Sequence, residues 1–524
     1  MAVEKSLLKV RDLLCAGAAI AGLVAGPAGA TTLQQALLQA YSSSPVLTTA
    51  RAQLRATDED VPIAKAQSRL QVSGTAAITQ ETSDITRFDN GGRVFTGGVN
   101  LSYPLFQGGR VKNGIHAAEA RDIGGRADLR TTEGNFFVQA VSAYMDVIRD
   151  EAIVQLNIKN VRVLETNLKA SHDRFQVGDL TRTDVAQSEA RLSLARSQLS
   201  TVQGNLVHSR EVYREVIGVW PEALEAPPPL PSLPPSPDQA ASIALGNNPA
   251  IASAAAQAKA AGYDVRTAAG ARLPTFSAVA GSTYYNYLST PSLPVGLPQG
   301  VGGIGGQGYG QAYSSNSVGV QMTVPLYQGG LPAAKVRQAR ALESAAIERG
   351  IDVERQVIAN TRAAFAEYQA AEAAIAANQQ AVSANSLALE GVRAENTAGT
   401  RTVLDVLNAE QEYLNAQVSL VTAEHDRYVA GFALLNAMGK AEARDLNLDG
   451  GALYDPLAYY NRVHKRLGDW SDGSRPTAQA SRTTGPTPAD SDVLPLQPAP
   501  DTGVDQMGPP APLRTGAPVT PGAR

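Results

Sequence analysis

One seven-residue segment of the chain occurs twice at a fixed separation. Residues 103–109 read YPLFQGG and residues 324–330 read VPLYQGG. The same offset of 221 residues relates two further groups of positions: Gly178, Thr181, Asp184 and Val185 to Gly399, Thr402, Asp405 and Val406, and Gly218 to Gly439. A constant offset over roughly 110 residues predicts two internal structural repeats, which strongly limits the folds open to the chain.

Spacing and composition predict the domain boundaries. Ser44-Pro45 corresponds to Asn248-Pro249 at an offset of 204, so the second copy has an insertion, which we assign to a Gly-, Ser- and Pro-rich loop at about 288–315. We expect the repeats to cover 31–226 and 239–440, joined by a Pro-rich linker at 227–238. A terminal segment at 441–470 and a disordered tail at 471–524, rich in Pro, Gly, Ser and Thr, follow.

The first 30 residues have the pattern of an export signal. Basic residues are followed by an apolar stretch from Leu13 to Val24 and by the small-residue site Ala28-Gly29-Ala30. A transmembrane anchor is the weaker alternative, because about 12 apolar residues cannot cross a bilayer core. The only cysteine, Cys15, would leave with the signal peptide. We therefore expect an exported chain with neither disulfides nor thiolate metal sites.

Composition and motifs give no support to an enzyme. The formal net charge of −4 gives no reason to expect a nucleic-acid partner. Residues 300–305 fit a dinucleotide-binding pattern by letters, but they follow no strand that leads into a helix. Residues 445–450 begin like a calcium loop, yet Pro456 stands where glutamate is needed. We expect no catalytic residue, cofactor or metal.

Long uninterrupted helices are expected in both repeats. No proline lies between Pro104 and Pro221 or between Pro332 and Pro456, and Gly178 and Gly399 each interrupt one stretch. This predicts a helix of about 65 residues and a return helix of about 35 in each copy. One opening helix per copy, 33–66 and 239–271, would pair with the rest of each long helix.

Apolar spacing predicts that these helices pair as coiled coils. The expected seam of the first return helix comprises Val185, Leu192, Leu194, Leu199, Val202 and Leu206. Gly124, Gly125 and Gly134 lie within the first long helix and leave open whether it is continuous there.

Two short alternating segments lie between the opening and long helices of each repeat. They are residues 71–78 and 99–103 in the first copy, and 274–287 and 318–324 in the second. Apolar residues alternating with polar ones over about 10 residues are typical of membrane β-barrels. Four strands cannot close a barrel, and open edges are not tolerated in lipid, so the barrel must be shared. Three chains would give 12 strands, whereas two would give eight and a filled interior.

These features together resemble the TolC family of outer-membrane efflux and secretion channels. The resemblance covers about residues 31–465, and its most specific segment is residues 399–409, GTRTVLDVLNA. It also rests on the two Pro-Leu-aromatic-Gln-Gly-Gly turns, on Asn247-Asn248-Pro249, and on Gly178-x-x-Thr181-x-x-Asp184-Val185.

The resemblance implies a mainly α homotrimer with a 12-stranded barrel, four strands per chain, continued by a helical coiled-coil barrel. Such a duct lies in the outer membrane of a Gram-negative bacterium, contacts outer-membrane lipid, extends into the periplasm and performs no chemistry. Its implied partners are a periplasmic adaptor and an inner-membrane ABC or proton-driven RND-type transporter. The terminal segment resembles one that packs on the duct's mid-section in some members. The cargo stays open between drugs and a secreted protein, and the competing classes are a periplasmic coiled-coil scaffold and a secreted enzyme.

The resemblance also implies a gate at the periplasmic helix turns. Asp405 would line the narrowest ring, Arg401 would contact Thr183 on the neighbouring helix pair, and Asp184 would face Asn396. Asn408 and Asn396 stand where the family prototype has a second aspartate and a tyrosine. The turns expected to contact adaptor or transporter comprise Gly178, Leu180, Thr181, Gly399, Thr400 and Thr402.

The two aspartates have a simpler possible role. Asp184 and Asp405 could merely cap the return helices, because Asp is favoured near a helix N-terminus. Both roles can coexist, since three Asp405 carboxylates in a symmetric ring would also attract cations and raise their own apparent pKa.

Overall fold

The computed structural model describes residues 30–80, 93–286, 288, 312–446, 448 and 453–485. Nearly all of the expected signal peptide, most of the expected long loop and the tail beyond residue 485 lie outside the described residues. The chain divides into two compact units. The first comprises Met1–Arg149, Ser209–Ala384 and Ala416–Pro486, and the second comprises Asp150–His208, Asn385–Asn415 and Thr487–Arg524.

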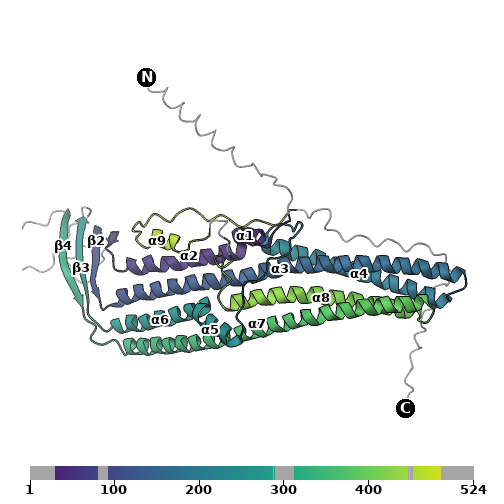
Figure 1. Ribbon diagram of the computed structural model, residues 1–524. Coiled ribbons are helices and arrows are strands. Elements are labelled where there is room, and N and C mark those ends of the chain that lie inside the picture. The colour runs from purple at the N-terminus through teal and green to yellow at the C-terminus, as the bar shows by residue number, and fades with distance from the viewer. Residues whose placement is uncertain are drawn as a thin grey trace, which may run out of the picture. The chain divides into compact units, whose positions relative to one another are not determined.

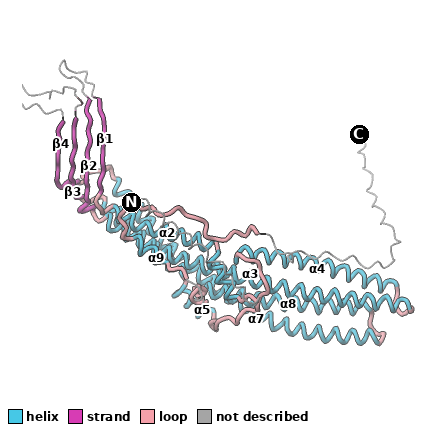
Figure 2. The backbone as a smooth tube through the Cα atoms, turned by 90° about the horizontal axis from the view of Figure 1, so that it is seen from above, coloured by secondary structure: helices cyan, strands magenta, loops and turns pink. Residues whose placement is uncertain are grey.

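A four-stranded antiparallel sheet belongs to the first unit. Its strands are β1 (Gln71–Gln80), β2 (Arg93–Gln107), β3 (Thr275–Asn286) and β4 (Ala312–Thr323). They lie side by side in the order β1-β2-β3-β4, as Figure 2 shows. All four expected strands are therefore present, and β1 and β4 form the two edges of the sheet within the described chain.

The β2–β3 pairing joins segments that are far apart in the sequence. It runs from Phe95 opposite Asn286 to Gln107 opposite Thr275. The register shifts between Pro104 and Phe106. Pro104 has no N–H to donate to the hydrogen bonds between the strands. The Pro-Leu-aromatic motif thus ends a strand as well as preceding a helix.

Four long helices form two hairpins. They are α3 (Arg110–Gln176, 67 residues), α4 (Arg182–Ile217, 36 residues), α7 (Leu331–Thr397, 67 residues) and α8 (Val403–Ala437, 35 residues). These lengths agree with the expected 65 and 35 residues. Among the described helices, none combines the length and apolar character needed to cross a membrane.

Each opening segment is two helices rather than the single helix expected. The first consists of α1 (Leu33–Ser43) and α2 (Pro45–Ala66), and the second of α5 (Pro237–Asn247) and α6 (Pro249–Gly270). The expectation was wrong because a proline disfavours helical backbone at the residue before it. Ser44 accordingly adopts φ −65° and ψ 126°. Asn248 adopts φ −64° and ψ 121°, and its side chain accepts a hydrogen bond from the N–H of Ala250 at 2.9 Å.

The interior glycines do not interrupt α3, which is continuous through all three. A Cβ on Gly124 would lie 3.5 Å from Cβ of Ala256 in α6, and one on Gly125 would lie 3.3 Å from Cδ1 of Leu54 in α2. The glycines therefore allow neighbouring helices to approach α3 closely, which offsets part of their low helix propensity.

Tyr144 of α3 is one of the largest fully buried side chains of the first unit, and its ring contacts that of Tyr213. The Tyr144 hydroxyl lies 2.8 Å from the carbonyl oxygen of Thr31 and 2.7 Å from that of Glu225. Thr31 in turn pairs with Leu224 in a parallel bridge. Nearby, the rings of Tyr41 and Phe137 stack at 6.0 Å between centroids. The start of the described chain is thus fixed to the segment that follows α4.

A short C-terminal helix, α9 (Pro456–Val463), lies along α2 (Figure 1). The Tyr459 hydroxyl donates to Glu59 of α2 at 2.7 Å, and Nη1 of Arg69 donates to the carbonyl oxygen of Arg466 at 2.8 Å. Residues 471–485, which we expected to be disordered, are described without regular secondary structure. We refer to residues 453–485 as the C-terminal segment.

Gly270 at the end of α6 provides a test of close backbone packing. An alanine Cβ there would meet the main-chain oxygen of Gly108 and would lie 2.8 Å from Cγ of Arg110. We expect Gly270→Ala to lower the free energy of unfolding by about 1–3 kcal/mol. The control is Gly114→Ala in α3, where an added Cβ would meet nothing within 4 Å. This substitution should stabilise the helix by about 0.5–1 kcal/mol. Urea unfolding followed by circular dichroism measures both, and equal midpoints would contradict the packing.

Candidate gate at the helix turns

The second unit contains both turns that connect the long helices. At the first turn, Gly178 has φ +81°. Its N–H donates to the carbonyl oxygen of Phe175 at 3.0 Å, and the N–H of Asp179 donates to that of Arg174 at 2.9 Å. These bonds satisfy carbonyl groups at the end of α3, as in a Schellman motif. The glycine is needed because a side chain would be strained at this φ.

The second turn has the same geometry. Gly399 has φ +79°, its N–H donates to the carbonyl oxygen of Asn396 at 3.0 Å, and the N–H of Thr400 donates to that of Glu395 at 3.0 Å. A Cβ on Gly178 or Gly399 would meet nothing within 4 Å. Backbone conformation, and not crowding, therefore requires glycine at both turns.

Both aspartates of the predicted gate cap a return helix. Thr181 donates to the Asp184 carboxylate through its N–H at 3.0 Å and its hydroxyl at 2.7 Å, while Oγ1 of Thr181 accepts from the N–H of Asp184 at 3.3 Å. Thr402 and Asp405 repeat the arrangement at 3.0, 2.8 and 3.2 Å. Each return helix thus starts with a reciprocal capping box.

These hydrogen bonds also set the charge of the turns. Donation from the Thr402 hydroxyl, and then from its N–H, lowers the pKa of Asp405, and Thr181 does the same for Asp184. Because the pKa is lowered, the stability that each cap contributes is fully present above the ordinary carboxyl pKa of about 3.9. That stability is lost as the pH falls through the folded-state pKa. Both turns therefore carry an ionised aspartate at neutral pH. In the single chain the pKa of Asp405 is therefore lowered, whereas a ring of three Asp405 carboxylates is expected to raise it.

A set of polar contacts connects the two turns within the second unit. Nε of Arg174 pairs with Asp179 at 2.6 Å, and its guanidinium also donates to Oδ1 of Asn396 at 3.4 Å. Nδ2 of Asn396 donates to the carbonyl oxygen of Arg401 at 2.8 Å, and the Arg401 side chain pairs with Glu395 at 2.8 Å. Asn396 is therefore held by Arg174 and Arg401. The contacts expected between Arg401 and Thr183, and between Asp184 and Asn396, stay predictions.

Further contacts, which sequence reasoning missed, connect the hairpins beyond the turns. Nη2 of Arg191 in α4 donates to Oδ1 of Asn408 in α8 at 2.6 Å. Glu410 of α8 has a side chain only 4% exposed, and its carboxylate accepts from Nδ2 of Asn167 at 2.8 and 2.9 Å and from Arg393 at 2.9 Å. Leu407, three residues before Glu410, is buried, so the two residues lie on the same apolar face of α8. A charged residue on an apolar helix face is the sequence pattern that could have predicted these contacts.

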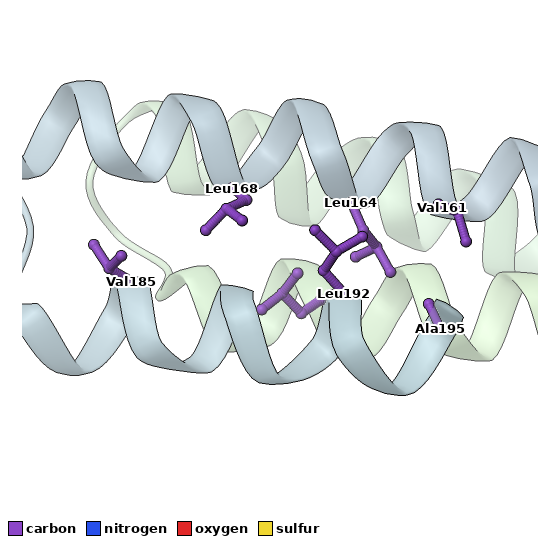
Figure 3. Close-up of a cluster of buried hydrophobic side chains, with 7 residues drawn as sticks. Val161, Leu164, Leu168, Val185, Leu192 and Ala195 are labelled. Atoms are coloured by element: carbon purple, nitrogen blue, oxygen red, sulfur yellow. The ribbon is translucent and has the colours of Figure 1, made fainter. Parts of the chain in front are cut away.

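An apolar seam packs the second unit together, as Figure 3 shows. It comprises Val161, Leu164, Leu168, Val185, Leu192, Ala195 and Leu407. Of the predicted seam positions, Leu199 is partly buried and Val202 and Leu206 are buried. Leu194 was wrongly included and is 64% exposed, because two residues after Leu192 the helix presents the opposite face.

The predicted contact residues lie at the exposed end of each hairpin. Gly178, Thr181, Gly399, Thr400 and Thr402 are exposed, Thr183 is exposed and Leu180 is half-buried. Two apolar neighbours that the sequence analysis did not single out, Phe175 and Val177, are 43% and 79% exposed. The first turn therefore presents apolar surface as well as polar groups.

Comparison with known proteins then identifies the family. A family model described as outer membrane efflux protein matches residues 36–219 and 240–440. The chain belongs to the outer membrane efflux protein family. It is 36% identical over 458 residues to outer membrane efflux protein BepC of Brucella suis biovar 1, covering 86% of this chain and 95% of BepC.

Two further relatives agree with this assignment. Outer membrane protein TolC of Escherichia coli is 25% identical over 352 residues, covering 65% of this chain and 68% of TolC. The crystal structure of the Campylobacter jejuni CmeC outer membrane channel has a TM-score of 0.68 at 16% sequence identity, covering 83% of this chain and 90% of that chain. The expected resemblance to the TolC family is confirmed, and the protein is one of the outer membrane.

The buried carboxylate of Glu410 provides a test of the hairpin contacts. We expect Arg393→Ala to lower the local opening free energy of α8 by about 1–3 kcal/mol, because it leaves a buried carboxylate short of a donor. Arg401→Ala is the matched control, since its pair with Glu395 is half exposed and solvent-exposed ion pairs contribute little to stability. Native-state hydrogen exchange over residues 403–415 measures both. Equal losses in the two variants would contradict the assigned role of Glu410.

Proposed function

We propose that three copies of this chain form an outer-membrane exit duct, a passive conduit whose energy is supplied by an inner-membrane ABC or RND-type transporter coupled through a periplasmic adaptor. The observation that carries the proposal is a four-stranded sheet whose two edge strands have no further partner among the described residues, in a chain of the outer membrane efflux family. The cargo is drugs, a secreted protein, or both.

The strand edges support the sharing of a barrel between chains. Every residue of β1 and of β4 is exposed. Backbone N–H and C=O groups at such edges cannot remain unpaired in lipid. Pairing β4 of one copy with β1 of the next removes both edges, and three copies give 12 strands. Two copies would give eight, which is too few for an open lumen.

The side chains of β4 support a lipid-facing surface. Val318, Val320 and Met322 are 88%, 66% and 57% exposed, and they alternate with polar or small residues. In a strand, alternate residues lie on one face. One face of β4 is thus apolar and would contact outer-membrane lipid, while the other is polar and would line the lumen.

The hairpins would form the periplasmic part of the duct and end in its gate. Asp405 would line the narrowest ring, with Asn408, Arg401, Thr183, Asp184 and Asn396 around it. Asn408 already accepts a hydrogen bond from Arg191 and carries no charge, so the ring would contain one carboxylate per chain. The exposed turns, with Phe175 and Val177, would contact the adaptor or the transporter.

Single-channel recording in planar bilayers tests the duct and its gate. We expect the wild-type protein to conduct and to be blocked by divalent cations, and Asp405→Ala to conduct more and to lose most of the block, because three carboxylates are removed. Asp184→Ala is the matched control, since it loses an equivalent capping box but should keep the block. Absence of conductance in the wild type would contradict the duct, and equal block in the wild type and Asp405→Ala would contradict the gate.

A further inference from the structure

A pair of buried carboxyl groups lies between α2 and α3. Asp58 of α2 is fully buried and Asp122 of α3 is 2% exposed. Neither carboxyl oxygen of Asp58 has a hydrogen-bond partner among the described residues, and Oδ1 of Asp122 has none either. Buried polar atoms in folded proteins are nearly always paired, so three unpaired carboxyl oxygens at one place require an explanation.

Arg126, the cation that acts on Asp58, cannot by itself neutralise both carboxylates. Arg126 of α3 pairs with Oδ2 of Asp122 through Nη2, but its Nε has no partner among the described residues. Its guanidinium carbon lies 4.9 Å from the ring centroid of Tyr460. If both aspartates were ionised, one buried negative charge would therefore be uncompensated, which is costly.

We propose that Asp58 and Asp122 share one proton, and that this proton holds the C-terminal segment in its seat on α2 and α3. Protonation converts one carboxyl group into a donor and the other into its acceptor. The pair then forms a hydrogen bond across the two helices, and the remaining negative charge is matched by Arg126. The proposal is independent of the proposed duct, because it concerns the seating of one segment within the chain.

The C-terminal segment lies directly over this pair. The Tyr460 ring covers Arg126, and the hydroxyl of Tyr454 is buried without a hydrogen-bond partner among the described residues. The N–H of Tyr454 donates to the Tyr41 hydroxyl at 3.1 Å. Loss of the proton would therefore create a buried charge beneath partly buried tyrosines, and water could reach that charge only if the segment lifted.

The charged and titratable groups around the pair come from three elements. They are Arg51, Arg55 and Glu59 from α2, Glu119 and Arg126 from α3, and Tyr454, Asp455, Tyr459 and Tyr460 from the C-terminal segment. Glu59 adds a further negative charge close to Asp58, and Arg126 is the cation that acts directly on Asp58.

The expected pH range follows from the environment of Asp58. Burial, and then the neighbouring Asp122, raise the pKa of Asp58 to about 7. With the segment lifted, a hydrated carboxyl group would return toward its ordinary pKa of about 3.9. Because the seated state has the raised pKa, the proton's contribution is fully present in acid and is lost as the pH rises to about 7.

Hydrogen–deuterium exchange of the full mature protein in detergent tests the proposal. We expect the opening equilibrium of amides 456–463, corrected for intrinsic exchange, to increase up to about tenfold per pH unit between about pH 5 and pH 7, since one proton is released. It should level off above that range. Asp58→Asn, a neutral side chain of the same shape, should abolish the slope. Asp60→Asn, at an exposed acid on the same helix, should keep the slope of the wild type.

Three results would overturn the proposal. They are opening that does not depend on pH in the wild type, an unchanged slope in Asp58→Asn, and a pH profile that moves with sodium or calcium concentration, which would indicate a bound metal ion in place of the proton. Infrared spectroscopy of the wild type is an independent measure: a protonated-carboxyl band at pH 6 that disappears at pH 9 is expected. Absence of this band at pH 6 contradicts the proposal even if Asp58→Asn does not fold. Asp122→Asn serves as the second variant in the exchange experiment.

Discussion

The rest of the structure depends on the hydrogen-bonding capacity of two sheet edges. A strand carries N–H and C=O groups on both sides, and lipid supplies no partner for them. Among the strands that the structure describes, β2 and β3 are paired on both sides, whereas β1 and β4 are each paired on one. Four strands are also too few to close on themselves. The same constraint therefore favours both an assembly of several chains and a surface that faces lipid.

The helices meet a different requirement, because they are long and poor in bulky side chains. An apolar seam of Val, Leu and Ala side chains packs α3, α4 and α8 in the second unit, and polar contacts, part-buried at Glu410 and exposed at Asn408, fix their register. Glu410 is held from α3 and α7, and Asn408 from α4. An apolar seam alone lets helices slide or rotate, whereas a buried charge with fixed partners permits one arrangement. The gate that we propose at the turns would need such a defined arrangement when closed.

Much of the fold could be predicted from local sequence. The lengths of the long helices followed from the absence of proline and from Gly178 and Gly399, which interrupt the helical stretches and adopt a left-handed conformation. The strands followed from alternation. One failure was local: Ser44 and Asn248 break the opening helices, because each precedes a proline. The other failures depend on tertiary contacts, since Gly124 and Gly125 are accommodated only because other helices approach α3 there. Arg174 and Glu410 could not be assigned partners, because their contacts depend on the register between two hairpins.

Cross-linking of the two edge strands tests the central claim most directly. Cys15, in the expected signal peptide, is the only cysteine. After removal of the signal peptide, every disulfide would therefore form between introduced cysteines. Thr75→Cys in β1 would be combined in turn with Ser315→Cys, Ser317→Cys or Gly319→Cys in β4, oxidised in outer membranes and separated under denaturing conditions. We expect linked dimers and trimers, and nothing larger, for at least one pair. Monomers alone across the series, or a ladder beyond three chains, would contradict the shared barrel.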